Sequence, residues 1–250
     1  MLHVHRAERT ARLVDGLAAV LGTPLADPFA SEVVAVPAKG VERWLAQRLS
    51  TVLGAGSAGD GICSGIVFPS AGRLVDEALA AARGADPRDD PWADPVWPLL
   101  EVVDEHLGEP WCRVLAHHLG YGADDHRRGR RWSAAARLAG LFRSYGAHRP
   151  QMLRDWADGR DTDGHEPLPA DLTWQAELWR RLRDRLGPSP AERLEVECAA
   201  LRADPRLSDL PERISIFGPT RLHADALAVL SALAEHRAVH LWLPHPSPVV

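Results

Sequence analysis

Segments with a strand pattern occur only near the two ends of this sequence, and this distribution restricts the possible fold more than any other feature. These segments lie at residues 2–5, 32–36, 66–69, 213–217 and 238–243. Between them, residues 8–21, 41–52 and 221–235 carry apolar side chains at helical spacing. Strands that alternate with helices are typical of βαβ units in a parallel sheet. The sequence therefore predicts an α/β core made of residues 1–68 and 205–250.

The long middle of the chain has no strand pattern. Proline, glycine and aspartate breaks separate its helical candidates, which we place at 70–83, 93–107, 110–119, 132–146, 150–158, 171–186 and 190–202. Most of the tryptophans lie here, between Trp92 and Trp179, and aromatic residues at helical spacing usually belong to a core. The sequence predicts a large all-α insertion over residues 70–204.

Charge is distributed unevenly along this predicted insertion. The net charge of −5 excludes a uniformly basic nucleic-acid coat but not a local basic groove. Residues 86–109, called the acidic stretch below, contain eight acids and one base, whereas residues 126–154 contain eight arginines and no acid. Arg127, Arg128, Arg130 and Arg131, followed by Trp132, are suited to phosphate binding and base stacking. Two solvated helix surfaces of opposite sign remain the alternative interpretation.

No nucleotide-hydrolysing motif is complete. Lys39 is the only lysine among 29 basic residues, and it lies in the loop after the second predicted strand, where a phosphate loop would lie. A P-loop requires GxxxxGK[ST], but here the lysine precedes Gly40, no hydroxyl residue follows, and Pro37 removes an amide donor. Residues 217–219 supply no metal-binding acid. We expect phosphate binding through Lys39 at most, and no catalytic residue in this segment.

Other functional classes are also excluded. Cys63, Cys112 and Cys198 form neither a CxxC pair nor a zinc spacing, which predicts reduced, buried thiols and no metal site. There is no apolar run of membrane-span length and no signal-peptide pattern at the start, so we expect a cytoplasmic protein without membrane contact. The sequence stops directly after a predicted strand, and we expect it to be part of something longer.

Several segments together resemble the opening of the RecC family, the gamma chains of exodeoxyribonuclease V, in order and approximate spacing over nearly the whole sequence. The matching segments are Asp27-Pro28-Phe29 with 32–36, Gly40 to Trp44-Leu45 and Leu49-Ser50, Gly61-Ile62 with Ile66 to Pro69, Leu141-Phe142 through Tyr145 to Arg149-Pro150 and Leu153, Trp174-Gln175-Ala176 with Leu178-Trp179, and Ile216-Phe217-Gly218 leading to His240-Leu241.

The resemblance implies a parallel-sheet domain like the first domain of a superfamily 1 helicase, inactive because its ATPase residues are lost. It implies RecB-like and RecD-like partners, which use ATP and Mg²⁺, while this chain itself holds no cofactor. Its implied role is a scaffold that splits duplex DNA and channels single strands, scanning them for the Chi hotspot, in double-strand break repair by homologous recombination. By position, Pro37, Lys39, Arg43 and the 124–131 loop would face the DNA channel.

Two other classes of function remain open at this point. One is an active nucleotide-binding enzyme on the α/β core, and the other is a structural docking module that contacts partner chains without touching DNA. The docking module would use the acidic stretch and exposed tryptophans. Binding of ATP through Lys39 would favour the enzyme, and an absence of DNA contact would favour the docking module.

Overall fold

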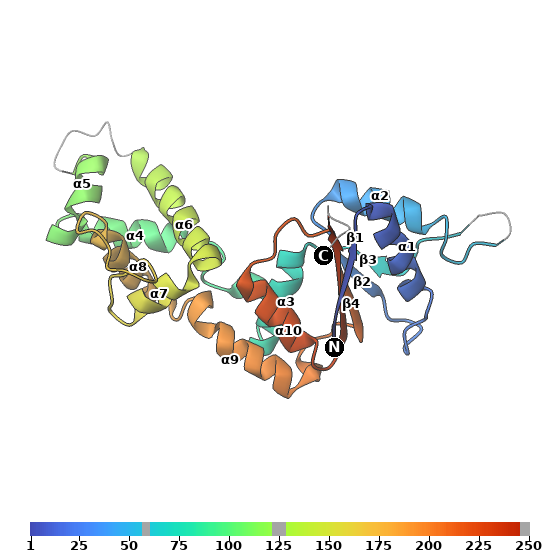
Figure 1. Ribbon diagram of the computed structural model, residues 1–250. Helices are drawn as coiled ribbons and strands as arrows, with labels where there is room; N and C mark the ends of the chain where they lie inside the picture. The colour runs from blue at the N-terminus through green and yellow to red at the C-terminus, as the bar shows by residue number, and fades with distance from the viewer. Residues whose placement is uncertain (57–60, 122–128, 246–250) are drawn as a thin grey trace. The chain divides into compact units, whose positions relative to one another are not determined.

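The computed structural model describes residues 1–56, 61–121 and 129–245 and divides the chain into two compact units (Figure 1). The sheet unit comprises Met1–Pro87 and Glu197–Val250, and the helical unit comprises Arg88–Val196. The boundaries differ from the expected 70–204 insertion because the helix at Ala71–Arg83 packs against the helix at Ala224–Leu233 in the sheet unit. Each unit is described separately below.

The sheet unit contains a five-stranded sheet in which all pairings are parallel. Its strand order is β1-β5-β4-β2-β3. The strands are β1 (Leu2–Ala7), β2 (Glu32–Ala35), β3 (Ile66–Val67), β4 (Arg213–Phe217) and β5 (Ala238–Pro244). All five strands were predicted from the sequence, and the predicted α/β class with a parallel sheet is confirmed.

Four helices cover the two faces of this sheet. Figure 1 shows the sheet nearly edge-on, with α1 (Thr10–Leu21) and α2 (Lys39–Leu49) on one side and α3 (Ala71–Arg83) and α10 (Ala224–Leu233) on the other. The crossovers through α1 and α2 advance along the sheet in one direction, and the crossover through α10 runs in the opposite direction. Because crossovers in a parallel sheet have one hand, those that run in opposite directions along the sheet place their helices on opposite faces.

The core between the sheet and α1 requires a glycine at one point. A Cβ on Gly16 would lie 2.9 Å from Cζ3 of Trp242, so α1 approaches the indole ring more closely than any other residue would allow. The indole Nε1 of Trp242 donates a hydrogen bond to Ser215 Oγ at 3.1 Å. Trp242 is therefore held between α1 and the neighbouring strand.

The helical unit contains α4 (Val96–His106), α5 (Arg113–Leu119), α6 (Arg130–His148), α7 (Pro150–Ala157) and α8 (Thr173–Leu186). The boundary between the two units falls within α9 (Pro190–Ala203). Short 3₁₀ turns cover Pro87–Asp89, Pro110–Cys112 and, in the sheet unit, Pro205–Leu207. The core of the helical unit surrounds Trp156 and Trp179, whose ring centroids are 6.0 Å apart in an edge-on arrangement.

The expectation that the tryptophans of this region belong to the core is correct for Trp156 and Trp179 but wrong for Trp97 and Trp132. These two side chains are 62% and 53% exposed. Spacing along the sequence could not reveal this, because a helix has one face toward its neighbours and one toward solvent, and only packing decides which side chain lies on which.

The cysteines are free thiols: Cys112 and Cys198 are buried and Cys63 is half-buried. Burial raises the pKa of the Cys112 thiol to about 11, so this side chain is an unreactive part of the core. Among the residues that the structure describes, no helix is both long enough and apolar enough to span a bilayer.

Candidate nucleic-acid interface

The carboxyl ends of β2 and β4 meet at the point where the sheet changes its winding direction. The helix after β2 covers one face and the helix after β4 covers the other, although the two strands are neighbours. In open parallel sheets, ligands bind in the crevice at such a switch point. The loop after β2 and the turn after β4 are therefore the first places to examine for function.

At this switch point Lys39 is the first residue of α2, two residues before the helix start expected at residue 41. Its Nζ donates to Glu42 Oε2 at 2.7 Å, and its side chain is 80% exposed. The amides of Val41 and Glu42 both donate to the carbonyl of Ala38, which closes the first turn instead of leaving these amides for a phosphate. The lysine thus pairs with a carboxylate on an exposed surface, and these two amides are occupied.

The turn after β4 supplies no catalytic group either. Gly218 has a positive φ of 59°, and its amide donates to the carbonyl of Trp242 at 2.9 Å. Neither it nor the neighbouring Phe217 and Pro219 carries a carboxylate that could hold a metal ion. This edge of the sheet therefore has no P-loop motif after β2 and no carboxylate at residues 217–219.

Arg43 lies one helical turn after Lys39 on α2, and its side chain is exposed. Within the described ranges it makes no hydrogen bond and no ion pair. Residues four apart on a helix are surface neighbours. The structure thus brings Lys39 and Arg43 together on one exposed side of α2, beside the switch point.

The second predicted group of basic residues lies at the start of α6, in the helical unit. Arg127 and Arg128 fall outside the described residues, whereas Arg130 and Arg131 form the first turn of α6. Arg130 is exposed, while Nη1 of Arg131 lies 3.2 Å from Oδ1 of Asp104. The two pairs, on α2 and on α6, belong to different compact units.

The first turn of α6 carries two arginines and no acid, which is unfavourable for the helix by itself. The amino end of a helix has a partial positive charge, so each cation there costs a few tenths of a kcal/mol, and a bound anion reverses this. Trp132 projects from the same turn with 53% of its surface exposed. Exposed guanidinium groups beside an exposed indole can contact phosphates and stack on a base.

One exposed face of α6 was not singled out in the sequence analysis. Arg137 lies two turns after Arg130 on the same face and is exposed, with no hydrogen bond or ion pair in the described part of the chain. The other exposed residues on this side are Ser133, Gly140, Ser144 and His148, whereas Ala134 and Leu141 beside them pack against the core. The helix α6 contains no acid along its whole length. The signal was available, because arginines seven residues apart on a helix share a face.

The acidic stretch is largely neutralised by arginines from later helices. Arg185 on α8 contacts Glu101 at 2.7 Å and Glu105 at 2.6 Å, and its hydrogen bond lowers the pKa of Glu105. Asp90 pairs with Arg193 at 2.5 Å. These contacts tie helices of the helical unit together, so much of the acidic stretch is committed to internal pairs and is not a free acidic surface.

The geometry therefore defines an α/β protein with a parallel sheet and an arginine-rich helical unit. The RecC N-terminal domain family matches residues 2–250. The chain is 51% identical over 255 residues to the RecBCD enzyme subunit RecC of Mycobacterium tuberculosis (strain ATCC 25618 / H37Rv), covering 98% of this chain and 22% of that protein.

Two further relatives bear the same name. Identity is 50% over 253 residues to the RecC subunit of Mycolicibacterium smegmatis, covering 98% of this chain and 21% of the relative. It is 26% over 234 residues to that of Escherichia coli (strain K12), covering 89% of this chain and 19% of the relative. The chain belongs to the RecC family and corresponds to its N-terminal part, spanning about a fifth of the length of these relatives.

Proposed function

We propose that this chain is the non-catalytic, DNA-guiding part of a RecBCD-type helicase–nuclease. The relatives are named as RecC subunits of the RecBCD enzyme, which supports a role in such a complex with RecB-like and RecD-like subunits in the cytoplasm. In this role the chain serves double-strand break repair by homologous recombination. It helps to split the duplex and to channel a single strand that is scanned for Chi.

The sheet unit acts in this proposal as a helicase-like domain that no longer hydrolyses ATP. Its support is the edge of the sheet between β2 and β4, where Lys39 is paired with Glu42 and the turn at Gly218 holds no acid. A motor needs a lysine for the phosphates, a hydroxyl for the metal and an acid that holds the metal. ATP and Mg²⁺ would accordingly be used by the partner subunits.

The proposed contact with DNA rests mainly on the first turn of α6. Arg130 is exposed there with no partner in the described ranges, and Trp132 is exposed beside it. Arginines dominate contact with the phosphate backbone, and aromatic side chains stack on unpaired bases. Lys39 and Arg43 on α2 form the second basic group that we assign to DNA.

The decisive experiment replaces Arg127, Arg128, Arg130 and Arg131 together by Ala in the full chain assembled with its partner subunits. Each phosphate contact on single-stranded DNA contributes about 0.7 to the slope of log K against log salt. We expect the slope to fall by about 2, because Arg131 is already paired with Asp104.

The matched control is Arg113→Ala, which removes one exposed charge on α5 of the same unit. The slope of this variant should equal that of the unmodified complex. If the quadruple variant also keeps the original slope, the assignment of these arginines to DNA is wrong.

A docking module is the second candidate, and Trp97 and Trp132 favour it because large exposed aromatic side chains are typical of interface anchors. Replacing both by Ala should then release a partner subunit during co-purification while the salt slope of DNA binding stays unchanged. The DNA-guiding proposal expects the partner subunits to be retained and single-strand affinity to fall through loss of stacking by Trp132.

A further inference from the structure

A cavity of about 430 Å³ lies in the helical unit where α6 ends and α7 begins. Its walls come from two segments that are close in space: the α6–α7 junction and the loop that follows α7. The lining residues are His148, Arg149, Pro150, Gln151, Met152, Arg154, Asp163, Gly164 and His165. None of them belongs to the two basic groups at the starts of α2 and α6 that were assigned to DNA above.

The lining is cationic. The side chains of Arg149 and His165 are exposed and make no hydrogen bond or ion pair with any residue of the described ranges. Arg154 also lines the cavity, and its Nε donates to the carbonyl of Ala191 at 3.0 Å. Two guanidinium groups and one carboxylate, that of Asp163, thus line the cavity.

That carboxylate is directed into its own turn. Oδ1 of Asp163 accepts the amide of Glu166 at 2.9 Å and the amide of His165 at 3.0 Å. These two hydrogen bonds, the one from Glu166 first, lower the pKa of Asp163. Asp163 therefore shapes the loop through Oδ1, while its charge also acts on Arg149 and His165 in the same cavity.

The backbone around the cavity is open toward the first turn of α7. The amide of Met152 donates to the carbonyl of Arg149 at 3.0 Å, whereas the amide of Gln151 has no partner in the described ranges. Gly164 has a φ of 101°, and a Cβ there would lie 3.4 Å from the nitrogen of Met152. A glycine at this position leaves space beside the amide groups at the helix start, where anions bind favourably.

The buried carboxylate of Asp155 holds the loop that carries His165 in place through hydrogen bonds. Asp155 is 5% exposed and accepts hydrogen bonds from Thr162 Oγ1 and, at 2.9 Å, from Gln151 Nε2. The indole Nε1 of Trp156 donates to the carbonyl of Thr162 at 2.8 Å. The two walls of the cavity are therefore held in place without a ligand, which lowers the entropic cost of binding one.

The exposed face of α6 leads to this cavity. Arg130 and Arg137 lie on that face, and the eighteen steps from Arg130 to His148 correspond to about 27 Å at 1.5 Å per residue. No acid interrupts the helix. A free phosphate would need the cavity alone, whereas a continuous acid-free face leading into it fits a strand that carries many phosphates.

We propose that the cavity binds a backbone phosphate of a nucleic-acid strand that lies along α6, through the side chains of Arg149 and His165 and the amide of Gln151. This proposal rests on the proposed DNA-guiding function and extends it to a defined subsite. Arg149 and His165 are the binding residues, and Asp155 is a positioning residue.

The test uses the full chain in its complex with the partner subunits and single-stranded DNA that carries azidophenacyl groups on phosphorothioate positions. After irradiation, crosslinked peptides are mapped. We expect crosslinks in peptides covering residues 148–165 and in the first turns of α6. The yield in the 148–165 peptides should fall at least fivefold in Arg149→Gln and in His165→Gln, and Arg113→Gln on α5 should leave it unchanged. Thermal melting identifies a variant that has lost its fold.

Crosslinks in the first turns of α6 without any in 148–165 would overturn the cavity proposal and leave the DNA-guiding function intact. Crosslinks nowhere in the chain would overturn both. A third experiment adds inorganic phosphate at about 50 mM. Sodium chloride of equal ionic strength is its control, because salt alone weakens phosphate contacts. If phosphate protects the 148–165 segment from deuterium exchange while DNA does not, the cavity is a site for free phosphate and the nucleic-acid assignment is wrong.

Discussion

Nε2 of His5 lies 2.9 Å from Nδ1 of His240, between the neighbouring strands β1 and β5. The His5 ring also stacks on Trp242, with ring centroids 3.8 Å apart. One nitrogen of the histidine pair must donate and the other accept, so the contact requires that at least one imidazole is neutral. Burial, followed by the nearby charges of His3, His5, Arg213 and the amino terminus, lowers the pKa of His240 to about 4.

The first prediction follows from this pair. A histidine whose pKa is about 4 in the folded state and about 6.5 when unfolded takes up its proton more readily after unfolding. Its stabilising contribution is complete above pH 6.5 and is lost as the pH falls toward 4, by about 3 kcal/mol in total.

Urea unfolding at several pH values between 7 and 4 measures this loss. His240→Asn should flatten the pH dependence in that window, while His118→Asn on the exposed side of α5 should not change it. An unchanged slope in the His240 variant would show that other groups cause the acid sensitivity.

The second prediction concerns the close approach of α1 to Trp242. Gly16→Ala would place a methyl group 2.9 Å from Cζ3 of the indole, so we expect a loss of about 1–3 kcal/mol in the free energy of unfolding. Gly72→Ala on α3 has no atom within 4 Å of the new methyl and should be neutral or stabilising by up to about 1 kcal/mol. Chemical denaturation of both variants gives the comparison, and equal stabilities would contradict the packing argument.

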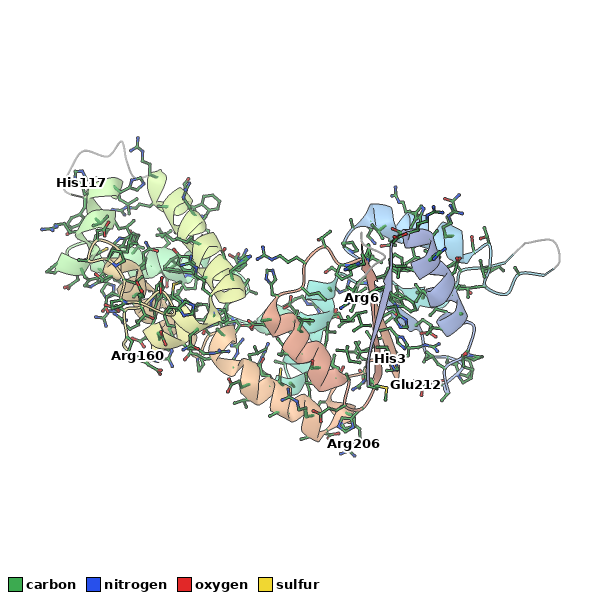
Figure 2. All side chains as sticks on the ribbon, in the orientation of Figure 1. His3, Arg6, His117, Arg160, Arg206 and Glu212 are labelled. Atoms are coloured by element: carbon green, nitrogen blue, oxygen red, sulfur yellow. The ribbon has the colours of Figure 1, made fainter. Side chains whose placement is uncertain are left out.

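The third prediction separates a buried carboxylate from an exposed one. Asp155 and Asp158 both lie 2.8 Å from Nη2 of Arg160, which Figure 2 labels in the helical unit. Asp155 also accepts hydrogen bonds from Thr162 and Gln151, so Asp155→Asn should cost about 1–3 kcal/mol because it leaves a buried donor unpaired. Asp158→Asn should change stability by less than about 0.5 kcal/mol.

The pH dependence of the same pair provides a second readout. The hydrogen bond from Thr162, ahead of those from other partners, lowers the pKa of Asp155 below its ordinary value. Its contribution to stability is therefore present above the unfolded-state pKa and is lost as the pH falls through the folded-state pKa. Denaturant unfolding in acid should show a smaller loss for Asp155→Asn than for the unmodified chain.

The fourth prediction concerns the ion pair at the start of α6. Asp104 holds Arg131 at 3.2 Å, and both side chains are partly exposed. Asp104→Asn should therefore leave stability nearly unchanged but free Arg131 for phosphate, raising single-strand affinity of the assembled complex about twofold at low salt. Fluorescence anisotropy measures the gain. The double variant Asp104→Asn with Arg131→Gln should show no increase, and an increase there would contradict the mechanism.

The strands near the two ends of the chain show what a local sequence pattern can predict and what it cannot. Residues 213–217 were predicted as a strand with the bounds that the structure has, because an apolar run between turn residues is a property of neighbouring residues alone. In contrast, nothing in the sequence pairs β1 with β5. His3 lies opposite His240, and Figure 2 shows His3 and Glu212 at the same end of the sheet.

The candidate site likewise combines features that the sequence predicts with features that it does not. The arginines of the first turn of α6 and the incomplete loop at Lys39 can be recognised from residue types and spacing. The exposure of Trp132 and the pairing of Arg131 with Asp104 could not be predicted. Both depend on which face of α6 packs against α4, and that choice is made by the whole helical core.

The sequence by itself determined the parallel α/β class, the helical middle of the chain, the absence of a complete P-loop motif and the acid-free arginine segment. Each is a pattern within a few dozen residues, which hydrophobic period and charge express directly. Only the tertiary structure decided the strand order, the neutralisation of the acidic stretch and the cavity that joins Arg149 to His165. These are contacts between residues distant along the chain, and folding selects them by burying the largest apolar area while leaving few polar groups unpaired.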